Sequence, residues 1–154
     1  MPTINSSIPS EVDVRGPRFA AWITTVVLAI VLLTTAFDLR AATALIGLQA
    51  LVFAIGAVGG PRRHPYGRVF AIVAPRLGPA TEREPVPPLR FAQLVGFVFA
   101  GTAFVGFVAG APVLGIVATA VALGAAFLNA AFGICLGCQV YPLIARRRPA
   151  PRPA

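Results

Sequence analysis

The chain has 154 residues, of which 57% are hydrophobic and only 12% are charged, and its mean hydropathy is +0.82. A soluble domain of this length needs more charge to cover its surface, so the composition excludes an ordinary soluble protein. The net charge of +8 comes from thirteen Arg residues without any Lys. Because these residues lie almost entirely outside the apolar runs, the charge predicts membrane orientation rather than binding to nucleic acid.

The first 18 residues form a polar arm that contains three Pro, and we predict it to be a disordered cytoplasmic segment. Glu11 and Asp13 precede the first apolar run, and no convincing small-residue cleavage site accompanies that run. The arm therefore does not resemble a signal peptide.

Four apolar runs follow, each about as long as a bilayer requires. They cover residues 19–37, 41–60, 91–110 and 113–134. Very short turns join the first run to the second and the third to the fourth, whereas a polar loop, residues 61–90, joins the two pairs. The sequence therefore predicts an all-α protein, a four-helix transmembrane bundle made of two helical hairpins, with its membrane domain over residues 19–138. No run has an ionisable residue in its interior, which argues against a proton-coupled transporter or pump.

Nearly all basic residues fall on one side of these predicted spans. The loop 61–90 carries six Arg, the tail 139–154 carries four, and the two short turns hold one between them. By the positive-inside rule, we expect a multi-pass protein of the bacterial plasma (inner) membrane with both termini in the cytoplasm. The tail is rich in Pro and Arg and is predicted to be unstructured.

The polar loop offers two interpretations of its Arg residues. One makes them topology determinants that also contact anionic lipid. The other makes them a cationic wall that receives an anionic sulfur species or polarises nearby thiols, and the two are compatible. Residues 68–74 begin with Arg68 and are otherwise apolar, and they predict a short segment at the membrane interface. His64 stands beside two Arg and a Pro, a pattern typical of a solvated loop residue.

Cys135 and Cys138 are the two cysteines of the chain, and they end the last apolar run. A Cys-x-x-Cys spacing on a helix puts both sulfurs on one face, where they can form a disulfide or hold one metal. Because the cytosol is reducing, we expect two thiols at rest rather than a permanent structural disulfide. The C-terminal end of a helix carries partial negative charge and disfavours a thiolate, whereas nearby Arg residues favour it. Gly137 is expected to end the helix.

Two alternatives to thiol chemistry stay open. Free Cys buries well, so both residues can serve as small apolar packing groups. A closed zinc site needs about four ligands. The chain offers the two Cys and His64, so a metal site would have to be shared across a homodimer. The sequence identifies no cofactor.

Four stretches of sequence resemble an uncharacterised family of small bacterial membrane proteins, which is defined as a domain of unknown function. These are residues 14–19, 75–79, 87–93 and 128–141. The most specific is the ending Asn-Ala-x-Phe-Gly-x-Cys-Leu-Gly-Cys, residues 129–138. The resemblance implies an association with thioredoxin-like and sulfurtransferase proteins, with Cys135 and Cys138 as the working residues and Asn129 and Gly133 in the same block. On a regular helix Asn129 would lie half a turn from Cys138, so direct contact would need an irregular helix or a neighbouring chain.

The chain is also similar to quinone-coupled thiol oxidases built on four-helix bundles. Those enzymes have further cysteines and place their chemistry on the oxidising side, so the resemblance assigns no quinone site here. We predict that Cys135 and Cys138 act as catalytic residues of a thiol-disulfide oxidoreductase or sulfur-transfer component. The expected partners are the lipid bilayer and a soluble thioredoxin-like or sulfurtransferase protein. Cys138 is expected to be the more exposed of the two. The alternative function is a non-enzymatic membrane scaffold or small permease subunit.

Overall fold

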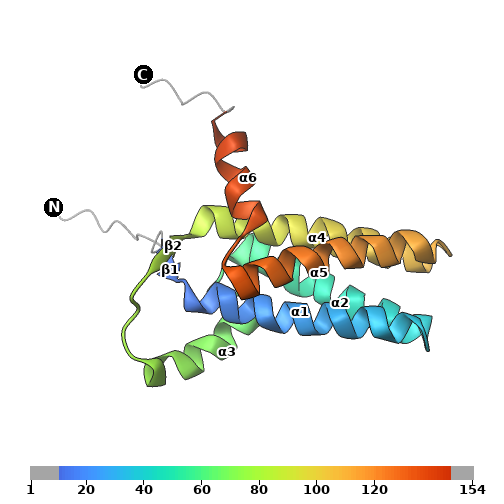
Figure 1. Ribbon diagram of the computed structural model, residues 1–154, viewed down its shortest axis with the longest axis horizontal. Helices are drawn as coiled ribbons and strands as arrows, with labels where there is room; N and C mark the ends of the chain where they lie inside the picture. Colours follow the sequence, from blue (N-terminus) through green and yellow to red (C-terminus); the bar gives the residue numbers. More distant parts are fainter. Residues whose placement is uncertain (1–10, 147–154) are drawn as a thin grey trace.

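The computed structural model describes residues 11–146 and confirms the four-helix bundle (Figure 1). Its long helices are α1 (Arg15–Thr35), α2 (Leu39–Gly59), α4 (Val86–Val108) and α5 (Pro112–Phe132). All four are long and apolar enough to cross a membrane. Each begins before the predicted run; α4 begins at Val86 instead of residue 91. Its first turn contains two Pro residues, which that turn tolerates because its N–H groups have no partner within the helix.

The helices pack as two antiparallel hairpins, α1 with α2 and α4 with α5. Between the hairpins, α2 packs on α4 and α1 packs on α5, which closes the ring. The core contains both small and large apolar side chains. Its members are Leu28, Val31, Ala42, Ile46, Ala50, Phe53, Ala100, Ala103, Phe107, Ala118 and Ala122. Small residues let the helix backbones approach closely, which is how apolar helices associate in lipid.

The two ends of the bundle differ in construction. At one end, which we call the turn end, residues 36–38 join α1 to α2 and residues 109–111 join α4 to α5. Asp38 caps α2 there, since its Oδ1 accepts hydrogen bonds from the backbone N–H groups of Arg40 (2.9 Å) and Ala41 (3.2 Å). The other end, which we call the loop end, holds residues 11–14, 60–85 and 133–146 and all the shorter elements.

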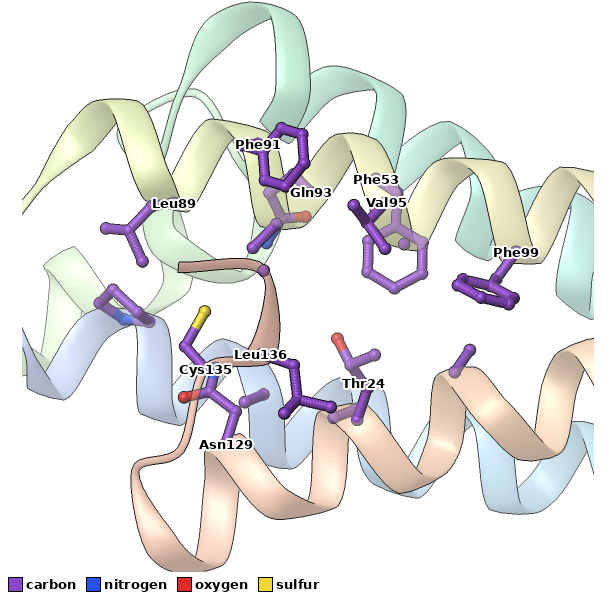
Figure 2. Close-up of a pocket in the computed structure, with 18 of the residues that line it drawn as sticks. Thr24, Phe53, Leu89, Phe91, Gln93, Val95, Phe99, Asn129, Cys135 and Leu136 are labelled. Carbon is purple, nitrogen blue, oxygen red and sulfur yellow. The ribbon is translucent and has the colours of Figure 1, made fainter. Parts of the chain in front are cut away.

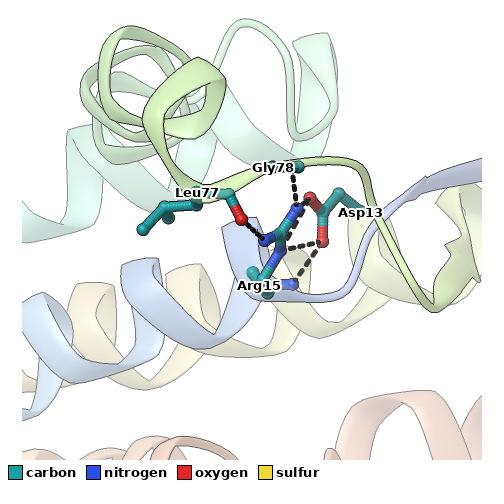
Figure 3. A network of polar contacts seen from close by, with 4 residues as sticks. All are labelled: Asp13, Arg15, Leu77 and Gly78. Atoms are coloured by element: carbon teal, nitrogen blue, oxygen red, sulfur yellow. Dashed lines mark hydrogen bonds and ion pairs between the residues drawn. The ribbon is translucent and has the colours of Figure 1, made fainter.

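Residues 11–18, which we predicted to be disordered, are ordered at the loop end. Strand β1 (Glu11–Asp13) pairs antiparallel with β2 (Arg83–Pro85). Arg15 ties this pair to the central loop: its guanidinium holds Asp13 and donates to the carbonyl oxygens of Leu77 (3.1 Å) and Gly78 (3.0 Å), as Figure 3 shows. The prediction failed because each strand is short and gains its partner only through the fold.

The central loop contains the helical segments α3 (Pro65–Val73) and η1 (Ala74–Leu77). Helix α3 covers most of the apolar segment predicted at residues 68–74. Phe70 of α3 is buried against α1, with its ring 5.8 Å from that of Phe19. Farther along, Arg90 of α4 donates to the carbonyl oxygens of Ala57 and Val58, both at 2.9 Å, and so binds the end of α2. The loop is therefore a folded cap on this end of the bundle.

The tail was predicted to be unstructured from residue 139, and this was wrong for its first part. Helix α6 (Leu136–Ala145) leaves the bundle sideways after α5 (Figure 1). It packs on α4, where Tyr141 lies 6.0 Å from Phe91 between ring centroids. The Pro and Arg residues that suggested disorder stand mainly after Ala145. Residues 147–154 lie outside the described part of the chain.

Candidate functional site

Helix α5 ends before the cysteines, at Gly133. Gly133 has a φ of 69°, in the left-handed region, and its N–H bonds to the carbonyl oxygen of Asn129 at 3.0 Å. This bond defines a glycine C-cap of the αL type, and the N–H of Ile134 bonds back to the carbonyl oxygen of Leu128 at 3.2 Å. We predicted that Gly137 would end the helix and that the cysteines would close it. Both predictions were wrong, because the break falls four residues earlier.

The cysteines instead begin α6. Cys135 is its N-cap residue, with extended backbone, and the Cys135 Sγ accepts a hydrogen bond of 3.3 Å from the N–H of Cys138. Cys135 and Cys138 are joined as a disulfide, with their Cα atoms 5.2 Å apart. The backbone thus brings the two sulfurs into bonding contact. The resting state in the cell, which we expect to be two thiols, stays a prediction.

This position reverses the electrostatic argument made from the sequence. The N-terminal end of a helix carries partial positive charge, and it favours a thiolate over a thiol. The backbone N–H of Cys138 already points at the Cys135 sulfur. Arg18 brings positive charge to the helix break two residues before Cys135, because its guanidinium carbon lies 3.7 Å from the position that a Cβ of Gly133 would occupy. Helix direction and nearby Arg therefore act in the same sense, where the sequence suggested that they oppose each other.

Helix α6 is held in place by a close approach to α4. A Cβ added at Gly137 would lie 2.7 Å from the Cα of Ala92, so only glycine fits between the two backbones. Gly137 is therefore a packing residue within α6 and not a helix terminator. Through this contact α4 positions the whole Cys-x-x-Cys segment.

A cavity of about 400 Å³ lies beneath the motif, between α1, α4, α5 and the start of α6 (Figure 2). Its walls are mainly apolar. Leu89, Gln93 and Phe99 line it from α4, and Asn129 and Cys135 line it from the opposite side. Cys138 does not line the cavity. Both cysteines are partly buried, so exposure does not single out Cys138 as we expected.

Asn129 and Cys135 come together because the chain breaks between them. From the sequence, contact between Asn129 and Cys138 was expected to need an irregular helix or a neighbouring chain. The cap at Gly133 supplies that irregularity, and both side chains line one cavity. Asn129 thus lies at the predicted site, although as part of its wall rather than on a shared helix face.

His64 was expected to be solvated, and this was wrong. Its side chain is only 2% exposed, because it packs against Gly56 of α2 and beside Gln93 of α4. Burial lowers the pKa of His64 to about 4, and the neighbouring Gln93 opposes this only in part. The histidine lines a second cavity, apart from Cys135. Residues 11–146 contain no group of three or more His, Cys, Asp or Glu suited to hold a metal, so the metal interpretation gains no support within one chain.

Gln93 is the residue that sequence reasoning missed. It lines both cavities, and its Oε1 is buried without a hydrogen-bond partner in the described structure. The signal that could have identified it is its position as a polar residue within an apolar run, and Gln49 has the same kind of position. Gln49 has a simpler role, since its Oε1 accepts a hydrogen bond of 2.7 Å from the hydroxyl of Tyr66.

Comparison with known proteins gives a family and no activity. No curated protein matches the chain. No solved structure matches it either. One family model matches residues 12–146, which includes every spanning helix, both cysteines and nearly all of the loop end. The chain therefore belongs to the family described as domain of unknown function DUF4395.

Proposed function

We propose that this protein is a membrane-embedded dithiol that exchanges disulfide or persulfide with a soluble thioredoxin-like or sulfurtransferase partner. The observation that supports this most directly is Cys135 at the N-cap of α6, with its sulfur accepting the N–H of Cys138. A sulfur so placed is stabilised as a thiolate, which is the reactive form in thiol exchange. The cavity beside Cys135 gives a second support.

The proposal includes a location, which rests on charge. Among the Arg residues within 11–146, only Arg40 stands at the turn end of the bundle, while the others belong to the loop end or to the adjoining helix starts. By the positive-inside rule the loop end faces the cytoplasm of a bacterial cell, across the inner membrane. The cysteines then meet soluble cytoplasmic partners.

In the proposed reaction Cys135 attacks first. Its thiolate attacks one sulfur of the partner's disulfide, forms a mixed disulfide and expels the partner's other sulfur as a thiolate. Cys138, once deprotonated, then attacks the Cys135 sulfur and releases the partner's second thiolate. The chain's dithiol loses two electrons and two protons, and the partner's disulfide gains them. With a persulfide partner, the Cys135 thiolate attacks the outer sulfur, forms a Cys135 persulfide and expels the partner's thiolate. The Cys138 thiolate then attacks the Cys135 sulfur, forms the Cys135–Cys138 disulfide and releases hydrosulfide.

The first experiment is to trap thiols in intact cells with a mass-tagged alkylating agent, under mild oxidative stress and under sulfide stress. We expect the Cys135–Cys138 pair to cycle between dithiol and disulfide or persulfide. Thiols that stay reduced and unreactive, with normal growth of the double Ser variant, would overturn the proposal. That result would favour the scaffold or small permease function with cysteines as packing groups.

Single substitutions then test the order of attack. If Cys135 attacks first, Cys138→Ser leaves a mixed disulfide unresolved, so a partner protein accumulates on the chain. Cys135→Ser should trap no partner, although it changes the same number of sulfurs. Membrane insertion of both variants is checked by fractionation. Partner capture only by Cys135→Ser would assign the attack to Cys138 instead.

A further inference from the structure

The second cavity at the loop end is lined by a buried histidine beside Gln93. It has a volume of about 650 Å³ and lies between the start of α1, the start of α4 and the segment from Pro61 to α3. His64 lines it and is 2% exposed, yet neither ring nitrogen has a hydrogen-bond partner among the described residues. Buried polar groups almost always have partners, so an unpartnered imidazole on a cavity wall leaves its hydrogen bonds to a molecule bound in that cavity.

The same cavity receives the N-terminal end of helix α3. His64 is the N-cap residue of α3, and its side chain makes no capping bond. Pro65 has no N–H, and the N–H groups of Tyr66 and Gly67 make no bond to a backbone carbonyl in the described structure. Gly67 itself lines the cavity. Free N–H groups at a helix start attract anions, because the helix dipole adds to their own positive charge.

Two cations complete the anionic preference. Arg62 and Arg68 line the cavity and are exposed, so their guanidinium groups stand at its rim. The one acidic residue on the wall is Asp13, whose carboxylate is already paired with Arg15. Arginine suits phosphate in particular, since its planar fork makes two parallel hydrogen bonds to adjacent oxygens.

The remaining walls are apolar, which points to a lipid as the source of the phosphate. Phe70, Ile72 and Leu89 line the cavity. Beyond it, α3 and η1 expose Val69, Ile72, Val73 and Leu77, which are unsuited to water but suited to acyl chains. A free phosphate ion would gain nothing from these surfaces, whereas a phospholipid would cover them.

We propose that this cavity binds an anionic phospholipid, with the headgroup phosphate held by His64, Arg62, Arg68 and the start of α3. The acyl chains lie along Phe70 and the exposed apolar side of α3. Basic pockets between membrane helices bind anionic headgroups in this manner. The inference does not rest on the thiol chemistry. It makes α3 a lipid-anchored lid beside the wall residues Leu89 and Gln93, which both cavities share.

Native mass spectrometry of the full chain in detergent tests this with three probes: phosphatidylglycerol, phosphatidylcholine and inorganic phosphate. We expect phosphatidylglycerol to stay bound where phosphatidylcholine is lost. The double variant Arg62→Gln/Arg68→Gln should bind phosphatidylglycerol at least tenfold more weakly. The control Arg63→Gln/Arg76→Gln removes the same charge from the same loop but not from the cavity, and should stay within twofold of wild type.

Three results would overturn the proposal. Equal losses in both double variants would show binding to general surface charge. Equal retention of the two lipids would show that the headgroup charge is not recognised. Competition by inorganic phosphate at lower concentration than the lipid would assign the cavity to a free anion. As a second readout, His64 is the single histidine of the chain, so its ¹⁵N signals are unambiguous and should shift with phosphatidylglycerol alone.

Discussion

The two ends of the bundle solve the same problem in opposite ways. At the turn end, three residues suffice to reverse each hairpin, and the helices below meet in a core of Ala, Leu, Val and Phe. At the loop end, residues 60–85 and 133–146 form a folded cap, and two cavities lie there. The described structure has three residues with buried side-chain atoms that lack a hydrogen-bond partner: Gln49, His64 and Gln93. All three contact or line that cap, since Gln49 bonds Tyr66 of α3 and the other two line its cavities.

This difference indicates where function lies. A segment needed only to connect helices has no reason to bury polar groups without partners, because each costs about 1–3 kcal/mol. The turn end connects its helices with short turns alone. The loop end instead has a folded cap with buried polar groups, and the cysteines and the histidine lie there. Substitutions at the loop end should therefore change chemistry or binding, and those at the turn end should change only stability.

The largest effect is expected at Gly137. Replacing it by Ala would put a Cβ 2.7 Å from the Ala92 backbone, so α6 must move away from α4 and carry Cys135 with it. Small displacements of reacting groups are costly, and we expect roughly a tenfold or greater fall in the rate at which the disulfide exchanges with dithiothreitol. The rate is followed by alkylation and gel shift. Gly124→Ala is the control, because a Cβ there meets nothing within 4 Å. Equal rates for the wild type and Gly137→Ala would contradict this role.

Gly106→Ala should give the opposite result at the turn end. A Cβ there would lie 2.9 Å from the backbone nitrogen of Gly115, so the α4–α5 hairpin must open. Overpacking of this kind costs about 1–3 kcal/mol, which should appear as a lower unfolding temperature in detergent. The thiol exchange rate below that temperature should equal the wild-type rate. A changed rate would show that the two ends are coupled, and it would contradict the view that the turn end affects only stability.

The sequence allowed the spans to be predicted but not the cap. Apolar runs report membrane helices directly, because every spanning residue meets lipid or another helix. The break at Gly133 was hidden, since Ile134 and Leu136 continue the apolar pattern and glycine also serves helix packing. The burial of His64 depends on Gly56 and Gln93, which are distant in the sequence, so its neighbours Arg62 and Arg63 misleadingly indicated solvent. The spacing of the cysteines identified them as a pair, but it did not show that they begin a separate helix, α6.

His64 gives the smallest and most specific test of the loop end. Because burial lowers the pKa of His64 to about 4 from an ordinary value of 6.5, the folded protein resists protonation that the unfolded chain accepts. Stability is therefore full above pH 6.5 and falls as the pH drops towards 4. Between pH 7.5 and 5.5 we expect a loss of about 1 kcal/mol, given 1.36 kcal/mol per pKa unit.

The measurement compares unfolding at pH 7.5 and 5.5 in the wild type and in His64→Gln, which keeps a polar side chain but cannot titrate. The His64→Gln variant should not show the loss of stability at pH 5.5 that protonation of His64 causes in the wild type. Arg15 lowers the pKa of Asp13, so this carboxylate titrates at lower pH. Burial raises the pKa of Glu84 against a partial offset from Arg18, and because both proteins contain Glu84 its contribution cancels in the comparison. Added phosphatidylglycerol should reduce the wild-type loss, because a nearby phosphate favours protonated His64 in the folded state. An identical acid response in both proteins would mean that His64 is hydrated in the cavity, and the argument that it awaits a ligand would fail.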